Sequence, residues 1–124
     1  MARTYTKAQE DFVETLLMLE NNGEPLETTR VAKKLGISKP AVHQMGHELI
    51  DKGLITRKDY GDMKLTKAGR ALAEEVLHRH KILKEFLLAI GVEEAIAEED
   101  CCQIEHVISE PTFQTIEAFV KNRK

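Results

Sequence analysis

The succession of helix caps and turns in the first half of the chain constrains its fold more than any other feature. Thr28 or Thr29 is placed to cap a short helix, and Gly36 follows the last apolar residue of that helix as a stop signal. Ser38 is placed to cap the next helix, with Pro40 in its first turn and apolar residues at helical spacing behind it. We therefore expect two short helices joined by a tight turn.

A β-hairpin is expected directly after this helix pair. Gly53 closes the second helix, and residues 54–58 and 63–66 have the pattern of two short strands around an Asp- and Gly-containing turn at residues 59–62. Two helices with a tight turn, followed by a hairpin, is the order of a winged helix-turn-helix, whose second helix enters the DNA major groove.

Helical periodicity covers most of the remaining chain, with glycine or proline near the predicted boundaries. The further predicted helices run from about Thr6 to Asn22, from a Thr66 cap to about Ile90, from about Glu93 to Ile108, and from Thr112 to Lys121. We therefore expect a mainly α protein, with a winged helix-turn-helix domain at residues 1–70 and a second, helical domain at residues 71–124.

The net charge of -3 hides an uneven distribution along the chain. From Thr28 to Lys67 nine Lys and Arg stand against four Asp and Glu, whereas from Ala71 onward six basic residues stand against eleven acidic ones. This separation fits a nucleic-acid surface joined to a cation-binding half, although ordinary solvated surfaces carry patches of similar size.

The helix after Ser38 is the predicted recognition helix. On the side opposite its apolar stripe, Gln44 can donate to and accept from an adenine edge, and Lys39 can reach a guanine or a phosphate. Basic residues on the preceding helix and on the hairpin suit phosphate contacts, which position a protein without reading sequence. An ordinary solvated helix face is the alternative. The predicted DNA-binding residues are Arg30, Lys33, Lys34, Ser38, Lys39, Pro40, His43, Gln44, His47, Arg57, Lys58, Tyr60 and Lys64.

The segment Cys102-Gln103-Ile104-Glu105-His106 carries the strongest chemical pattern in the second half. If the segment is helical, Cys102, Glu105 and His106 share one face at i, i+3 and i+4, so a thiol, a carboxylate and an imidazole converge on one ion. A small buried Cys102 without a ligand role is the alternative.

Two further segments carry possible ligands. Asp11 and Glu14 share an i, i+3 face of the first helix, and His80 lies on the long helix after Thr66. The three segments together could close on one metal ion.

At this point the chain resembles a known family over nearly its whole length. The winged helix-turn-helix, the long helix carrying His78-Arg79-His80, and the run from Cys102 to Val107 look like the metal-dependent repressors typified by the diphtheria toxin repressor and the manganese transport regulator. The resemblance implies a metal-dependent repressor of metal-ion homeostasis that binds a pseudo-palindromic operator in double-stranded DNA as a homodimer. It also implies that residues 71–124 form a metal-binding and dimerisation domain.

The resemblance also implies a set of metal ligands that combines features of the two types of repressor. Asp11 and Glu14 match carboxylate ligands of the manganese regulator, and Cys102 matches the cysteine of the diphtheria-type proteins. His80, Glu105 and His106 match ligands that both types share. The metal ligands implied are Asp11, Glu14, His80, Cys102, Glu105 and His106.

A second metal site of the diphtheria-type proteins is altered in this chain. Lys84 stands where a ligand glutamate would follow His80 by one turn, and the positive charge of Lys84 would repel a metal. Glu98 replaces a histidine ligand of that site and is a further candidate ligand. Glu85 points about 100° away around the helix and is a weaker one.

The donor types guide the choice of metal. Carboxylates suit manganese or ferrous iron, whereas a Cys102 thiolate shifts the preference toward iron, cobalt or zinc. We therefore expect Fe(II) to be favoured over Mn(II), with zinc, cobalt or cadmium able to substitute in vitro.

The acidic ligands also indicate a mechanism. Without a cation these carboxylates repel one another, and a divalent ion that removes the repulsion ties the DNA-binding part to the dimerisation part. Restricting the two recognition helices before they bind lowers the entropic cost of matching two half-sites.

No apolar run approaches the roughly 18 residues that a membrane span needs, and the first residues lack an apolar signal core, so we expect a cytoplasmic protein without a membrane partner. There Cys101 and Cys102 should be reduced.

Two other functions stay open. A winged-helix regulator that ignores metals could sense a small molecule or an oxidant through Cys101 or Cys102. An enzyme with Cys102 as nucleophile and His106 as base is the weaker alternative, because a helix interior offers no evident oxyanion donors, and we expect no enzymatic activity.

Overall fold

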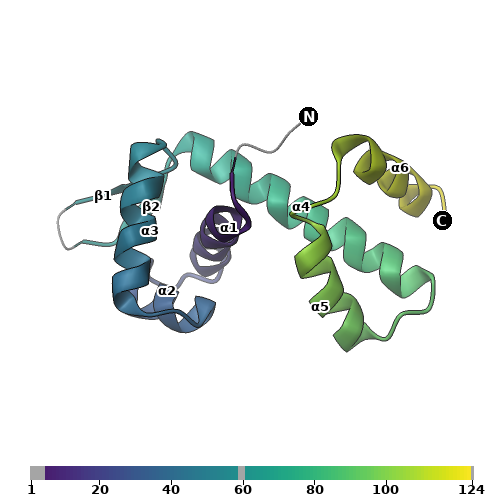
Figure 1. The fold of residues 1–124 in the computed structure, drawn as a ribbon, viewed down its shortest axis with the longest axis horizontal. Coiled ribbons are helices and arrows are strands. Elements are labelled where there is room, and N and C mark those ends of the chain that lie inside the picture. The colour runs from purple at the N-terminus through teal and green to yellow at the C-terminus, as the bar shows by residue number, and fades with distance from the viewer. Residues whose placement is uncertain (1–4, 59–60, 124) are drawn as a thin grey trace. The chain divides into compact units, whose positions relative to one another are not determined.

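The computed structural model describes residues 5–58 and 61–123 and has six helices and one hairpin within them (Figure 1). The elements are α1 (Lys7–Asn21), α2 (Thr28–Leu35), α3 (Lys39–Asp51), β1 (Ile55–Arg57), β2 (Met63–Leu65), α4 (Lys67–Ala89), α5 (Glu94–Ile104) and α6 (Glu110–Lys121). The chain divides into two compact units, an N-terminal unit (Lys7–Glu74) and a C-terminal unit formed mainly by the chain from Glu75 onward.

The N-terminal unit is a winged helix-turn-helix, as the order of elements predicted. α1 packs against α2, α3 and β2, and the strands β1 and β2 pair antiparallel with Thr56 opposite Lys64. The apolar stripes of the three helices and the inward residues of both strands form one core. Its most deeply buried side chains are Phe12, Val13, Leu16, Leu19, Val31, Val42, Leu49, Leu54, Ile55 and Met63.

Most of the predicted helix boundaries of this unit are confirmed. The Ser38 hydroxyl accepts a hydrogen bond from the Ala41 amide at 3.2 Å and caps α3. Gly36 ends α2 with a φ of 69°, a left-handed conformation that glycine adopts without the strain of a Cβ atom. The predicted threonine cap of α2 is wrong. Glu27 is the N-cap residue, without a side-chain capping bond, and Thr28 is already the first helical residue; the Thr28 hydroxyl accepts a hydrogen bond from Arg57 at 2.7 Å.

The start of α4 is fixed closely against the hairpin. The Thr66 hydroxyl accepts from the Gly69 amide at 3.0 Å and donates to the Gly53 carbonyl at 2.7 Å, so this predicted cap is confirmed. A Cβ atom at position 69 would come within 1.9 Å of the Leu54 carbonyl oxygen. Glycine is therefore required there by close backbone approach.

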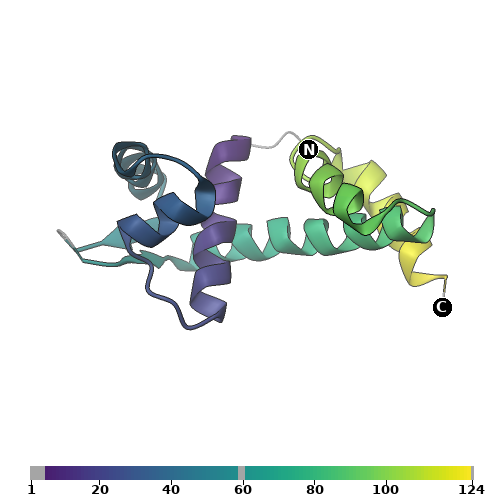
Figure 2. The same ribbon diagram turned by 90° about the horizontal axis from the view of Figure 1, so that it is seen from below.

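In the C-terminal unit α5 and α6 pack against the second half of α4 (Figure 2). The core of this unit contains Ile82, Leu83, Cys101, Phe113 and Val120, with partly buried Phe86, Leu87, Ile104, Ile108 and Ile116 around them.

Two predicted boundaries in this unit are wrong. α5 ends at Ile104 and not at Ile108, because the amides of His106 and Val107 bond carbonyls three residues back, at 3.4 and 3.0 Å, in tight turns. α6 begins at Glu110 and not at Thr112, because Ser109 caps it and Pro111 occupies its first turn. The segment Ser109-Glu110-Pro111, where a break between the two helices was expected, therefore forms the start of α6.

None of the helices in the described part of the chain has the length and apolar character that crossing a membrane requires.

Candidate metal centre and nucleic-acid interface

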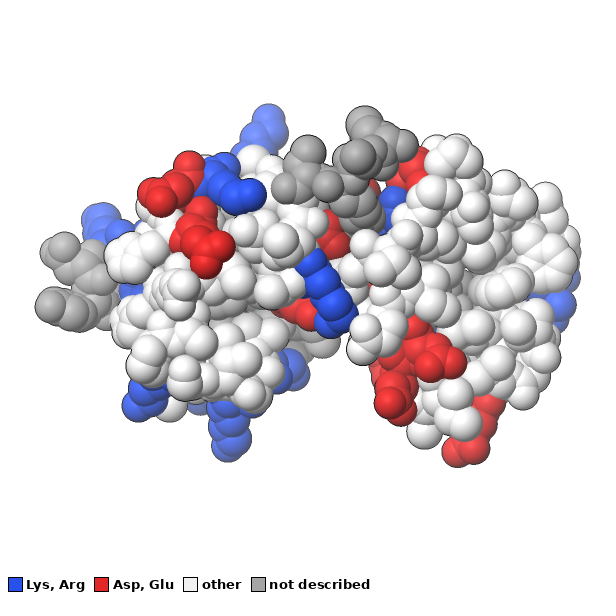
Figure 3. Space-filling model, in the orientation of Figure 1, with Lys and Arg blue, Asp and Glu red and all other residues white. Residues whose placement is uncertain are grey.

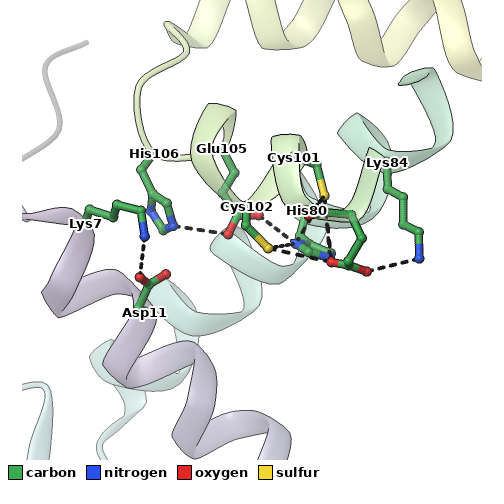
Figure 4. A network of polar contacts seen from close by, with 9 residues as sticks. Lys7, Asp11, His80, Lys84, Cys101, Cys102, Glu105 and His106 are labelled. Carbon is green, nitrogen blue, oxygen red and sulfur yellow. Dashed lines mark hydrogen bonds and ion pairs between the residues drawn. The ribbon is translucent and has the colours of Figure 1, made fainter. Parts of the chain in front are cut away.

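His80, on α4 of the C-terminal unit, is the centre of a cluster of possible metal donors (Figure 4). Its Nε2 atom lies 2.6 Å from a carboxylate oxygen of Glu98 on α5, and its Nδ1 atom lies 3.0 Å from Oε2 of Glu105. The His80 side chain is 17% exposed, so the imidazole is largely withdrawn from water while both of its nitrogens face carboxylates. A histidine between two carboxylates is a favourable setting for a cation.

Both cysteines of α5 point toward the same imidazole (Figure 4). The Sγ atom of Cys101 lies 3.6 Å from His80 Nδ1, and that of Cys102 lies 3.7 Å from it. Cys102 Sγ also lies 3.6 Å from a Glu98 carboxylate oxygen. Donor atoms of His80, Glu98, Cys101 and Cys102 all lie within 4.8 Å of one another, as the ligands of one ion would.

Glu98 is held in place by a lysine on the next turn of α4 after His80. Lys84 Nζ donates to Glu98 Oε1 at 3.0 Å, whereas Glu98 Oε2 faces the imidazole. Burial raises the pKa of Glu98, but the hydrogen bond from Lys84 and the charges of His80 and Lys84 outweigh it, so the net pKa is lowered. The expectation that Lys84 only repels a cation is therefore incomplete, because Lys84 also keeps Glu98 ionised and oriented.

The two thiols are protonated in this arrangement. Burial, followed by the charges of Glu98 and Glu105, raises the pKa of Cys101 to about 11. Burial, followed by the charges of Glu105 and Cys101, raises the pKa of Cys102 to about 12. A thiol with such a pKa is a poor nucleophile at neutral pH, and it becomes a thiolate ligand when a cation replaces the proton.

Glu105 and His106 are the most buried polar pair at this site. Both side chains are 1% exposed, and His106 Nε2 lies 3.2 Å from Glu105 Oε1, within ion-pair distance but outside hydrogen-bond geometry. Among the described residues Glu105 Oε1 accepts no hydrogen bond, although a buried carboxylate oxygen normally does. This buried acceptor, with the imidazoles and thiols around it, fits a divalent cation.

Asp11 and Glu14 lie on α1 of the N-terminal unit. They are one turn apart on the same helix face, as predicted, and both are half-buried. The Asp11 carboxylate accepts a hydrogen bond from Lys7 Nζ at 2.7 Å, and the two side chains form an ion pair. Their part in metal binding stays a prediction.

Within the C-terminal unit the structure brings His80, Cys102, Glu105 and Glu98 together, and it places His106 beside Glu105. Sequence reasoning considered Cys101 only as a sensor thiol and missed it as a possible metal donor, although its sulfur lies as close to His80 as that of Cys102. Its only sequence signal was its position next to Cys102, one residue outside the i, i+3, i+4 pattern.

The side of α3 opposite the core is open to solvent. The residues predicted to approach DNA from this helix, Ser38, Lys39, Pro40, His43, Gln44 and His47, are all exposed. So are Arg30, Lys33 and Lys34 on α2 and Lys58 and Lys64 on the hairpin. Figure 3 shows Lys and Arg side chains projecting from the surface of the N-terminal unit, at its left and lower edges. Tyr60 lies outside the described residues.

Arg57 differs from the exposed basic residues because its guanidinium is partly buried and contacts several residues of the N-terminal unit. Its guanidinium donates to the Thr28 hydroxyl at 2.7 Å and to the Gly61 carbonyl at 2.9 Å, and it lies 3.5 Å from His43 Nδ1. Arg57 thus ties the hairpin to α2 and α3. These contacts help to set the position of the hairpin relative to α3.

Comparison with known proteins matches both halves of the chain to one family. Residues 4–63 match the model of the iron-dependent repressor N-terminal DNA-binding domain, and residues 66–124 match that of the iron-dependent repressor metal-binding and dimerisation domain.

Similar proteins of known sequence are transcriptional regulators. The chain is 32% identical to an uncharacterised HTH-type transcriptional regulator of Methanocaldococcus jannaschii, over 93% of this chain and 94% of that protein. It is 34% identical to the transcriptional regulator MntR of Escherichia coli, over 90% of this chain and 72% of that protein. Both relatives are named as transcriptional regulators, which favours a regulator over the enzyme alternative.

The fold is shared with solved repressors. The structure of the manganese regulator SloR matches with a TM-score of 0.81 at 24% identity, over 98% of this chain and 56% of that one, so this chain spans little more than half its length. SloR is described as a manganese regulator, so this neighbour gives no support to the predicted preference for iron over manganese. The chain belongs to the iron-dependent repressor family of metal-dependent transcriptional repressors.

Proposed function

We propose that this protein represses transcription by binding operator DNA as a homodimer and that a divalent metal activates this binding. The observation that carries the proposal is the half-buried His80, whose two nitrogens face Glu98 and Glu105 at 2.6 and 3.0 Å with two thiols beside them. The imidazole, the carboxylates and the thiols gathered there are all donor groups that one divalent cation can accept together.

The proposed ligands come from the residues predicted above. His80, Cys102, Glu105 and His106 provide donors from α4 and from the end of α5, with Glu98 as a further donor. Asp11 and Glu14 would add carboxylate oxygens from α1. The proposed metal ligands are therefore Asp11, Glu14, His80, Glu98, Cys102, Glu105 and His106.

A divalent ion supplies positive charge that removes the repulsion among these carboxylates. In this proposal one ion is shared by side chains of α1 and by side chains of α4 and α5. Sharing the ion would restrict the number of arrangements that the two recognition helices can adopt. A protein with fewer arrangements before binding loses less entropy when its two recognition helices meet two half-sites.

We assign DNA recognition to residues 1–70 and metal binding and dimerisation to residues 71–124. Gln44 and Lys39 are exposed on α3, and we propose that they reach base edges. Basic residues on α2 and the hairpin are also exposed, and we propose that they contact phosphates, which fix position and not sequence. Two copies of α3, one from each protomer, would read a pseudo-palindromic site.

We propose ferrous iron as the preferred ion on the ground that Cys102 offers a thiolate, a softer ligand than manganese favours. Two similar structures, the manganese regulator SloR and a manganese-dependent transcriptional repressor in complex with manganese, support the opposite choice. The two ions are therefore to be compared directly.

The test is a titration of metal-free protein onto fluorescent DNA from the region upstream of its own gene, in chelator and then with Fe(II) or Mn(II). We expect either ion to tighten binding by at least about tenfold, a coupling of roughly 1.4 kcal/mol, with Fe(II) effective at the lower concentration. Equal affinity with ion and with chelator would leave the metal-independent regulator, sensing through Cys101 or Cys102, as the better account.

A further inference from the structure

We propose that His80, Glu98, Cys101 and Cys102 form a four-donor site for a soft divalent ion such as zinc, cobalt or cadmium, complete within the C-terminal unit. This inference rests on the proposed function, because it identifies how the repressor would distinguish one metal from another. It adds Cys101 to the proposed metal ligands, so that the two adjacent thiols bind the same ion.

The distances between donors are near those of a closed tetrahedral site. Ligands at ordinary zinc bond lengths are separated by roughly 3.3–3.8 Å from one another. Cys101 Sγ lies 3.7 Å from His80 Nε2 and 4.0 Å from Glu98 Oε2, and Cys102 Sγ lies 3.6 Å from the same oxygen. Small side-chain rotations therefore suffice to bring the four donors onto one ion.

The charges of the four donors and Lys84 balance once an ion is bound. Two thiolates and the Glu98 carboxylate carry three negative charges, a divalent ion leaves one of them, and the ammonium of Lys84, 3.0 Å from Glu98, compensates the last. An uncompensated charge at a half-buried site would be costly. Lys84 thus neutralises the remaining charge of the donor set without itself binding the ion.

The second nitrogen of His80 is also accounted for. When Nε2 binds the ion, Nδ1 keeps its proton and donates to Glu105 Oε2, 3.0 Å away. A carboxylate that accepts from a metal-bound histidine fixes the tautomer and the orientation of the ring. Glu105 is then a positioning residue for the soft ion and remains a ligand in the oxygen-rich set proposed above.

The burial of Cys101 supports a ligand role for it. Its side chain has no exposed surface and lies among Ile82, Leu83 and Phe113, where an apolar residue would serve packing equally well. Its sulfur nevertheless lies beside the His80 imidazole and the Glu98 carboxylate in the described structure. Two thiolates with one imidazole and one carboxylate select zinc, cobalt or cadmium over manganese.

The test is a titration of the reduced, metal-free chain with Co(II) at pH 8 without oxygen. We expect one Co(II) per chain, visible bands of tetrahedral cobalt, and a thiolate-to-cobalt charge-transfer absorbance that falls by about half in Cys101→Ser and in Cys102→Ser. Glu98→Gln should weaken Co(II) binding at least about tenfold, whereas the neighbouring exposed Glu99→Gln should not change it. A Cys101→Ser spectrum with full charge-transfer absorbance would overturn the proposal.

A second measurement needs no variant, because Cys101→Ser can fail to fold. X-ray absorption of the zinc-loaded wild-type chain should show two sulfur ligands at about 2.3 Å, and one sulfur or none would overturn the proposal. Parallel DNA titrations keep this site separate from the proposed function. One thiolate with intact metal-activated DNA binding would overturn the site alone, whereas two thiolates with metal-independent DNA binding would support the site and overturn metal activation.

Discussion

His80 and Glu98 face each other across the α4 and α5 helices with 2.6 Å between the imidazole Nε2 atom and a carboxylate oxygen. The two residues are far apart in the sequence, and the contact exists only because α5 packs along the second half of α4. Lys84 holds the other oxygen of the same carboxylate. The orientation of Glu98 is therefore fixed before any cation arrives, which lowers the entropic cost of binding one.

The first prediction concerns the type of donor at position 102. Replacing the thiol by a carboxylate in Cys102→Glu substitutes a hard ligand for a soft one, so selectivity should move from cobalt toward manganese. We expect the ratio of the Mn(II) to the Co(II) dissociation constant to fall by at least about tenfold, measured by competition with a metallochromic chelator. Cys102→Ser, which removes the thiol without adding a charge, is the control. An unchanged ratio in Cys102→Glu would show that residue 102 does not bind the metal.

The second prediction concerns pH. Burial is the main cause that raises the thiol pKa values, to about 11 for Cys101 and about 12 for Cys102. Each thiol that binds as a thiolate must release a proton, so below these values metal affinity rises with pH by about tenfold per unit for each thiol. Cobalt affinity should therefore rise about a hundredfold between about pH 7.5 and 8.5. A rise of only about tenfold would mean that one thiol binds.

The third prediction separates phosphate contacts from base contacts. Lys33, Lys34 and Lys58 are exposed, and changing any one to Ala should weaken binding to operator and to random DNA about equally. The slope of log affinity against log salt should fall by roughly one unit for each lysine removed.

Gln44→Ala should behave differently from these lysine variants. A side chain that reads a base edge contributes mainly to operator DNA, so the loss there should be about 1–3 kcal/mol with random DNA nearly unchanged. Fluorescence anisotropy on both DNAs at several salt concentrations measures the two effects. Gln44→Ala with undiminished operator preference would contradict the assignment of α3 as the recognition helix.

The fourth prediction concerns the joint between the hairpin and α4. Gly69→Ala would place a Cβ atom 1.9 Å from the Leu54 carbonyl oxygen, so the backbone must move. We expect the free energy of unfolding in urea to fall by about 1–3 kcal/mol. Gly46→Ala is the matched control, because nothing lies within 4 Å of its Cβ position in the α3 helix and alanine favours helices by about 0.5–1 kcal/mol. Equal stabilities for the two variants would contradict the close approach at Gly69.

Local sequence signals, chiefly helix caps and turn residues, were sufficient to predict most of the fold. Ser38 and Thr66 cap their helices through their own hydroxyls, and Gly36 ends a helix because it alone accepts a positive φ cheaply. These signals act within a few residues and are visible in a sequence. The end of α5 at Ile104 was not predicted, because tight turns with ordinary residues replace the usual glycine or proline stop.

The metal cluster could be predicted only in part, because tertiary packing decides which side chains meet. Spacing along one helix identified Cys102 and Glu105, but it could not show which face of α5 meets His80. That rotation is set by packing of α5 on α4, where Cys101 lies in the core and still reaches the imidazole. The same packing gave Thr28 a role in holding Arg57 instead of the helix-cap role that its position suggested.

The most direct measurement of the central claim is the affinity of the protein for Mn(II) and Fe(II) with and without its operator DNA, by isothermal titration without oxygen. If metal binding and DNA binding are coupled, the DNA must tighten metal binding by the same factor by which the metal tightens DNA binding. We predict that saturating operator DNA raises the metal affinity by at least about tenfold, and that random DNA of the same length has a smaller effect. Identical metal affinities with and without operator DNA would contradict the account.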